Sequence, residues 1–201
     1  DAPILIDQEG GRVQRMGPPH WRAYPPAAAF AAAASKNGAD AADLVRMGAR
    51  LIADDLREAG INVDCLPVLD VPVPGGHQVI GDRAYSDDPA LVAQLGLAAC
   101  EGLLQGGVLP VLKHIPGHGR AGADSHMELP RVDASLEALK ENDFIPFKAI
   151  ADMPLAMSAH VIYEAIDPER PATISPVVVD RIIRGLIGYD GLVMSDDLSM
   201  K

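Results

Sequence analysis

The chain has 201 residues, and 48% of them are hydrophobic, which is enough to bury a sizeable core in one compact domain. Its 28 acidic residues outnumber 17 Lys and Arg residues, giving a net charge of −11 without any basic stripe. We therefore expect no nucleic-acid partner, because phosphate binding requires clustered cations. No apolar run reaches membrane-spanning length and no signal-peptide pattern is present, so we also expect no membrane partner.

Two cysteines, Cys65 and Cys100, lie far apart in apolar surroundings. This spacing favours reduced thiols in the core over a disulfide framework. We therefore expect a reducing compartment.

Short aliphatic runs alternate with longer helical patterns, which is typical of βα units and a parallel sheet. Five strands are predicted, at residues 3–6, 61–66, 108–113, 154–159 and 191–194. Helices are predicted between them from apolar spacing and capping residues. The expected starts are Asp40, Asp88, Ser135 and Pro176, and Gly60 and Gly106 are expected to end the first two. The alanine-rich stretch 27–34 fits either a helix or a packed loop.

Each predicted strand is followed by ionisable residues, in the order Asp7 and Glu9, Asp70, Lys113 and His114, His160, and Asp196 and Asp197. A (β/α)₈ barrel assembles its active site from the carboxyl ends of all its strands, whereas a doubly wound sheet gathers groups only near a switch point. The fold class expected is therefore α/β, a TIM-like (β/α)₈ barrel. Such barrels take about 250 residues, so we expect residues 1–201 to be a single catalytic domain that lacks its first and last barrel units.

The stretch 113–126 carries three histidines on a segment whose glycines and proline forbid a regular helix. Catalytic groups commonly lie on such loops. A purely structural turn remains open, and so does a metal site formed by His114, His118 and His126. The favoured interpretation is that Asp124 orients His126, which can then give and take a proton near neutral pH.

Asp196 and Asp197 follow the last predicted strand and precede an apparent helix start. Successive strand residues point in opposite directions, so one is expected to face the barrel mouth and the other to cap the helix. A carboxylate at the mouth can attack an anomeric carbon. Around it, Asp7, Arg15 and Arg83 lie near glycines, as suits a polyhydroxylated ligand whose buried hydroxyls need partners. For Arg12 a surface salt bridge is expected.

Three motifs stand in the sequence at residues 6–15 (IDQEGGRVQR), 113–119 (KHIPGHG) followed by 124–126 (DSH), and 195–198 (SDDL). In order and spacing they match the single-domain bacterial β-N-acetylhexosaminidases of glycoside hydrolase family 3, the NagZ type, which the chain resembles essentially end to end. Two-domain relatives take their acid/base from elsewhere, so the DSH loop points to the hexosaminidase branch.

The resemblance implies a retaining hydrolase that removes terminal β-linked N-acetylglucosamine from muropeptides or small saccharides during peptidoglycan recycling in the cytoplasm. It places the nucleophile at Asp196, the acid/base at His126 with Asp124 as its partner, and leaves Asp197 as the cap. Sugar-binding positions fall on Asp7, Arg15, Arg83, Lys113 and His114. No cofactor and no metal are expected, and we expect a monomer. Nucleophilic attack by the substrate's own acetamido group, and a non-catalytic sugar-binding barrel, remain alternatives.

Overall fold

The computed structural model describes residues 2–76, 78–122 and 129–197. Five strands form its main sheet, namely β1 (Leu5–Ile6), β4 (Val63–Asp64), β5 (Leu109–Ile115), β7 (Leu155–Ser158) and β9 (Leu192–Ser195). Every neighbouring pair is parallel, and the strands lie in the sheet in chain order. The five predicted strands are confirmed, and the absence of an order reversal in this sheet distinguishes it from a doubly wound fold.

The helices begin where the capping residues predict. Asp40 accepts the backbone N–H of Ala42 at the start of α2 (Ala41–Glu58), and Asp88 accepts that of Ala90 at the start of α3 (Pro89–Gln105). Ser135 caps α4 (Leu136–Glu141), followed by α5 (Ile145–Ala149). Pro176 opens the last helix, which continues as the π-helix η3 (Val178–Ile187). The alanine-rich stretch is a helix, α1 (Ala27–Asn37).

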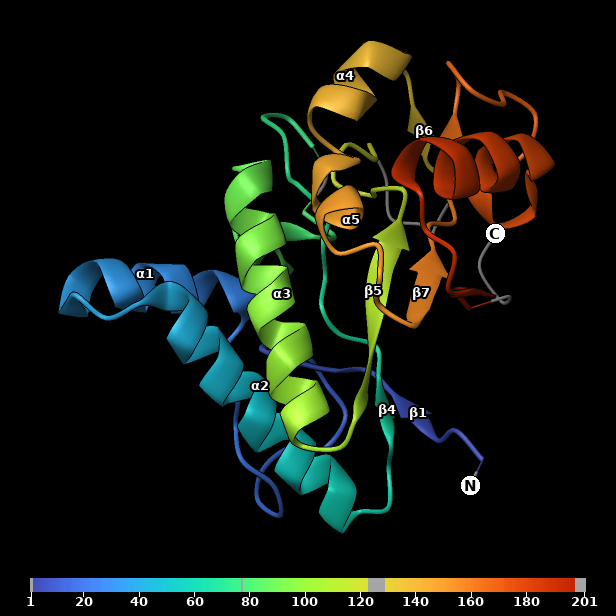
Figure 1. Ribbon diagram of the computed structural model, residues 1–201. Helices are drawn as coiled ribbons and strands as arrows, with labels where there is room; N and C mark the ends of the chain where they lie inside the picture. Colours follow the sequence, from blue (N-terminus) through green and yellow to red (C-terminus); the bar gives the residue numbers. More distant parts are fainter. Residues whose placement is uncertain (1, 77, 123–128, 198–201) are drawn as a thin grey trace.

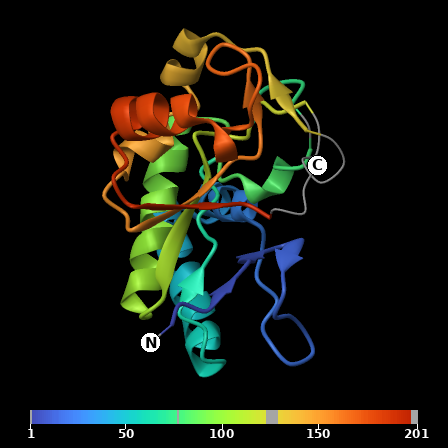
Figure 2. The same cartoon turned by 90° about the vertical axis from the view of Figure 1, so that its right-hand side faces the viewer.

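Smaller elements, which the sequence pattern did not predict, connect these units. An antiparallel hairpin is formed by β2 (Gln8–Gly10) and β3 (Val13–Gln14), and a parallel pair by β6 (Arg131–Val132) and β8 (Ile162–Tyr163). Two short 3₁₀ helices, η1 (Gly81–Arg83) and η2 (Ala172–Ile174), complete the chain. Figure 2 shows α3 on one side of the strands and the hairpin on the other.

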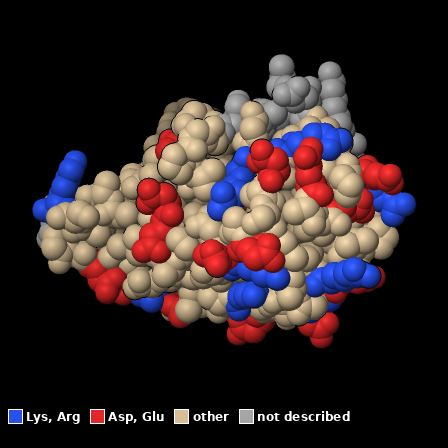
Figure 3. All heavy atoms as spheres, turned by 90° about the horizontal axis from the view of Figure 1, so that it is seen from above, with Lys and Arg blue, Asp and Glu red and all other residues tan. Residues whose placement is uncertain are grey.

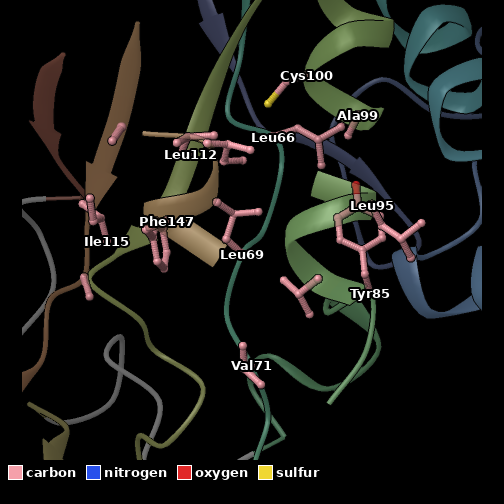
Figure 4. Close-up of a cluster of buried hydrophobic side chains, with 14 of the residues drawn as sticks. Leu66, Leu69, Val71, Tyr85, Leu95, Ala99, Cys100, Leu112, Ile115 and Phe147 are labelled. Atoms are coloured by element: carbon pink, nitrogen blue, oxygen red, sulfur yellow. The ribbon is translucent and has the colours of Figure 1, made fainter. Parts of the chain in front are cut away.

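The main core lies between the sheet and the helices α2, α3 and α5, which cover the same side of it (Figure 1). Leu69, Leu95, Leu112 and Phe147 meet there with Cys100 (Figure 4). Helix α3 can approach α2 closely because it presents Gly102, where a Cβ would lie 2.3 Å from a carbonyl oxygen of α2. Both cysteines are buried free thiols, as predicted.

A smaller apolar cluster on the opposite face of the sheet comprises Val63, Cys65, Val111 and Met157. Strand residues alternate between faces, so on β5 Val111 and Lys113 share this face while Leu112 joins the main core. The carboxyl ends of all five strands point to the same end of the sheet (Figure 1). Seen from that end, acidic and basic side chains intermingle over the surface (Figure 3). Within the described residues, no helix is long and apolar enough to cross a bilayer.

Candidate active site

A cavity of about 180 Å³ opens where the strands end. Asp7 directly follows β1, Lys113 and His114 lie near the end of β5, and Asp196 directly follows β9. The cavity is lined by all five predicted sugar-binding residues and the predicted nucleophile, namely Asp7, Arg15, Arg83, Lys113, His114 and Asp196. The predicted acid/base pair, Asp124 and His126, lies outside the described residues. Parallel strands thus bring together positions that are up to 189 residues apart in sequence.

Lys113 is the centre of a buried ionic network. Its Nζ lies 2.8 Å from Asp7 Oδ1 and 2.6 Å from Glu9 Oε1, while Arg83 donates two bonds of 2.8 Å to Glu9. Burial opposes ionisation, yet the opposite charges outweigh it, so the pKa values of Asp7 and Glu9 are lowered and that of Lys113 is raised. Arg15 adds a longer contact of 3.7 Å to Asp7. Asp7, Glu9 and Lys113 therefore stay charged at neutral pH.

Arg12 does more than the predicted surface salt bridge. It does pair with Asp82, at 3.3 Å, and both side chains are about half exposed. In addition, its Nη2 donates to the backbone carbonyls of residues 78, 79 and 80 at 2.7–2.9 Å. This segment leads directly into η1, which carries Arg83, so Arg12 holds one wall of the cavity in place.

His114 is held by Asp70, a fully buried residue from the extended segment after β4. Leu69 N–H donates to the Lys113 carbonyl at 2.6 Å, which places the next residue beside the imidazole. Asp70 Oδ2 lies 2.6 Å from His114 Nδ1. Burial alone would raise the pKa of Asp70, but its contacts with His114 and His118 lower it to about 2. The other ring nitrogen, Nε2, lies 3.9 Å from Asp196 Oδ2.

His118 packs beside His114, with ring centroids 5.6 Å apart. Burial and the neighbouring His114 lower the pKa of His118 to about 4, so this imidazole is neutral at pH 7. Its Nδ1 is buried and has no hydrogen-bond partner in the described part of the chain. These are two of the three ligands in the metal alternative, and the third, His126, lies outside the described residues. In the part of the chain that is described, no three His, Cys, Asp or Glu side chains are arranged to hold a metal ion.

Asp196 and Asp197 both line the cavity, contrary to the expectation that only one of them faces it. Strict alternation ends with β9 at Ser195, so it does not govern the two residues beyond the strand. The Asp196 side chain is 19% exposed, and its Oδ1 accepts the backbone N–H of Asp197 at 2.8 Å. Its Oδ2 is the oxygen nearest His114. The helix that Asp197 was expected to cap lies outside the described residues.

The segment that follows β5 is irregular, as predicted, and several contacts anchor its base. Tyr163 Oη donates to the Gly117 carbonyl at 2.6 Å, and Arg120 Nε donates to the buried Asp143 at 2.7 Å. Gly119 packs directly against the backbone of Val71, where a Cβ on residue 119 would lie 2.0 Å from the Val71 carbonyl oxygen. This part of the loop is therefore a packed support for the cavity.

Sequence reasoning noted that Glu9 and Asp70 follow predicted strands, but gave them no role in the site. His160, noted in the same way, bonds Thr173 and does not line the cavity. A charge at a strand end was thus the right signal for proximity to the site. It did not reveal that Glu9 and Asp70 contact residues that line the cavity, namely Lys113 and Arg83 for Glu9 and His114 for Asp70.

Comparison with known proteins now identifies the family. Residues 2–201 match the model of the glycosyl hydrolase family 3 N-terminal domain. This chain belongs to that family. A β-hexosaminidase from Alkalilimnicola ehrlichii is 42% identical over 98% of the chain and 56% of its own length. The chain thus spans about half the length of the curated relatives it matches.

Solved structures agree with this assignment. NagZ from Neisseria gonorrhoeae in complex with N-trifluoroacetyl-D-glucosamine has a TM-score of 0.91 and 37% identity, covering 98% of this chain and 58% of that one. A family 3 β-N-acetylglucosaminidase from Paenibacillus sp. str. FPU-7 has a TM-score of 0.90 and 40% identity, covering 98% and 37%. The predicted fold class, a TIM-like α/β barrel, is confirmed by this likeness.

Proposed function

We propose that this family 3 domain carries the active site of a retaining exo-β-N-acetylglucosaminidase. The observation that carries the proposal is the position of the Asp196 carboxylate in a cavity shared with Lys113, His114 and Asp7. Such a cavity offers a carboxylate for attack together with fixed charged donors and acceptors for sugar hydroxyls. Its relatives are named for the same activity, and one solved relative holds an N-acetylglucosamine analogue.

The shape of the cavity supports the removal of single terminal sugars. Its volume of about 180 Å³ suits one sugar unit. The ionised groups of the Lys113 network lie at its base. Arg83 and Arg15 add donors along the wall. We propose terminal N-acetylglucosamine on muropeptides or related small saccharides as the substrate. We further propose that the protein acts as a cytoplasmic monomer in peptidoglycan recycling.

In the proposed mechanism, Asp196 attacks C1 of the sugar while His126 protonates the departing glycosidic oxygen. This forms a bond between C1 and Oδ of Asp196 and breaks the bond to the leaving group. Water, deprotonated by the same His126, then attacks C1 and releases the sugar with Asp196 regenerated. Asp124 orients the His126 ring throughout.

A trapping experiment on the full-length protein tests the proposal. Hydrolysis of a nitrophenyl N-acetyl-β-glucosaminide is measured first, and a fluorinated N-acetylglucosaminide is then used to accumulate the covalent intermediate. Peptide mass mapping should place the label on Asp196, and Asp196→Asn should abolish both labelling and turnover. Asp197→Asn serves as the neighbouring control and should still be labelled. An unlabelled enzyme that turns over normally would refute the covalent step and favour attack by the substrate's acetamido group.

Two other outcomes would replace the proposal itself. Loss of turnover with a chelator, restored by a divalent metal, would support the metal-dependent hydrolase built on His114, His118 and His126. Binding of N-acetylglucosamine without any release of nitrophenol would support a non-catalytic sugar-binding barrel.

A further inference from the structure

The two carboxylate oxygens of Asp70 have different partners. Oδ1 accepts two backbone N–H groups, from His114 at 3.2 Å and from His118 at 2.7 Å. Oδ2 contacts the His114 ring at Nδ1, at 2.6 Å. One oxygen therefore fixes the backbone at the end of β5 and in the segment that follows it, and the other fixes the imidazole of His114 on β5.

The contact at Oδ2 determines where the His114 ring holds its proton. An ionised carboxylate has only acceptors, so the ring must present an N–H at Nδ1. In the neutral imidazole the lone pair then lies on Nε2. His114 lines the cavity, and Nε2 is the nitrogen 3.9 Å from Asp196 Oδ2. A lone pair there can accept a sugar hydroxyl, and the ring then donates no hydrogen bond to Asp196.

We propose that Asp70 is a positioning residue, which fixes the His114 tautomer so that Nε2 acts as an acceptor beside the nucleophile Asp196. The inference rests on the proposed function of the cavity. It adds a fully buried group that acts on the cavity through the His114 ring and through the backbone of His114 and His118.

The substitution Asp70→Asn separates the two tasks of the carboxylate. The Asn carbonyl oxygen can take the place of Oδ1 and accept the same two backbone N–H groups. The amide NH₂, in the place of Oδ2, can only donate to Nδ1, so the ring proton must move to Nε2. There the N–H points towards Asp196 and competes with both the sugar hydroxyl and nucleophilic attack. Asp70→Ala, in contrast, removes the backbone anchor as well.

The primary readout is ¹⁵N NMR of histidine-labelled, full-length protein at pH 7, with the His114 signals assigned by their loss in His114→Gln. Wild type should carry its proton on Nδ1, and Asp70→Asn should carry it on Nε2. A matched control is Asp55→Asn on α2, a buried carboxylate that accepts the Tyr24 hydroxyl at 2.6 Å and lies outside the cavity. This control should leave the His114 signals unchanged.

The second readout is turnover of the aryl N-acetylglucosaminide. Asp70→Asn should lower kcat by about 100-fold or more, as expected when an oriented histidine adopts the wrong tautomer. Its urea unfolding midpoint should fall less than that of Asp70→Ala, because only the alanine variant also loses the backbone anchor. Asp55→Asn should keep kcat within about threefold of wild type, since it leaves the ring proton in place.

A wild-type His114 with its proton on Nε2, or with both nitrogens protonated, would overturn the inference. So would an Asp70→Asn variant that changes tautomer without losing turnover. If wild type shows the expected tautomer but does not hydrolyse the substrate, the proposed function fails while the assignment of Asp70 to His114 stands.

Discussion

The ionic network beneath the cavity should contribute far more to stability than an ion pair of the same geometry on the surface. Glu9 and Glu101 each accept an arginine Nε at 2.8 Å, from Arg83 and Arg46 respectively. They differ in burial, since the Glu9 side chain is 5% exposed and that of Glu101 is 42% exposed. Glu9 also accepts a second bond from Arg83 and contacts Lys113, so replacing each by Gln compares a buried charge network with a single exposed ion pair.

The magnitude follows from what each substitution leaves behind. Glu9→Gln leaves the buried Arg83 without its carboxylate partner and Lys113 with Asp7 alone, and the loss of a buried partner costs about 3–5 kcal/mol. Glu101→Gln leaves Arg46 in contact with water and should cost less than about 1 kcal/mol. With a urea slope of about 2 kcal/mol per molar, the Glu9 variant should unfold at a midpoint lower by about 2 M.

Urea unfolding followed by circular dichroism measures both variants against wild type. The slopes should agree, so that the midpoints report stability alone. Equal losses in the two variants would refute the reasoning, because burial would then not control the contribution of the pair. A Glu9→Gln variant as stable as wild type would show that Lys113 loses its proton instead of remaining charged.

Three further predictions concern stability. Burial raises the pKa of Asp64 well above 3.8. The protonated side chain therefore stabilises the fold fully below pH 3.8, and this contribution is lost as the pH rises through the folded-state pKa. The unfolding free energy of Asp64→Asn should fall less between pH 4 and pH 7 than that of wild type, and parallel profiles would contradict this. Gly119→Ala should cost at least about 1–3 kcal/mol by thermal unfolding because its Cβ meets Val71. Gly122→Ala should be close to neutral, because a Cβ there meets no atom of the described residues within 4 Å. Asp40→Ala should cost about 1 kcal/mol through loss of the α2 cap, and an unchanged urea midpoint would refute that role.

The sequence was most informative where structure depends on neighbouring residues. Alternating apolar runs located all five strands of the sheet, and Asp40, Asp88 and Ser135 located three helix starts. Capping and periodicity act over a few residues, so they can be recognised without knowledge of the fold. Strand-end charges also predicted which residues would meet, because parallel strands deliver their carboxyl ends to one place.

These local signals did not predict which charged side chains of the site contact each other. Glu9 meets Arg83 across 74 positions, and Asp70 meets His114 across 44. Nothing in the spacing distinguishes these pairings from others among the same charged residues. They depend on the curvature of the sheet and on the path of the segments that follow each strand.

Two aspartates from the same part of the chain show what tertiary structure decided. The sequence places Asp64 in a strand and Asp70 just beyond it, and both side chains are fully buried. Asp64 accepts one backbone N–H, its Oδ2 has no partner among the described residues, and its pKa is raised. Asp70 accepts two backbone N–H groups and contacts an imidazole, and its pKa is lowered to about 2. Burial favours the neutral acid, and only hydrogen bonds and charge from distant segments reverse that preference. The sequence supplied two similar carboxyl groups, and the packing of the chain raised the pKa of one and lowered the pKa of the other.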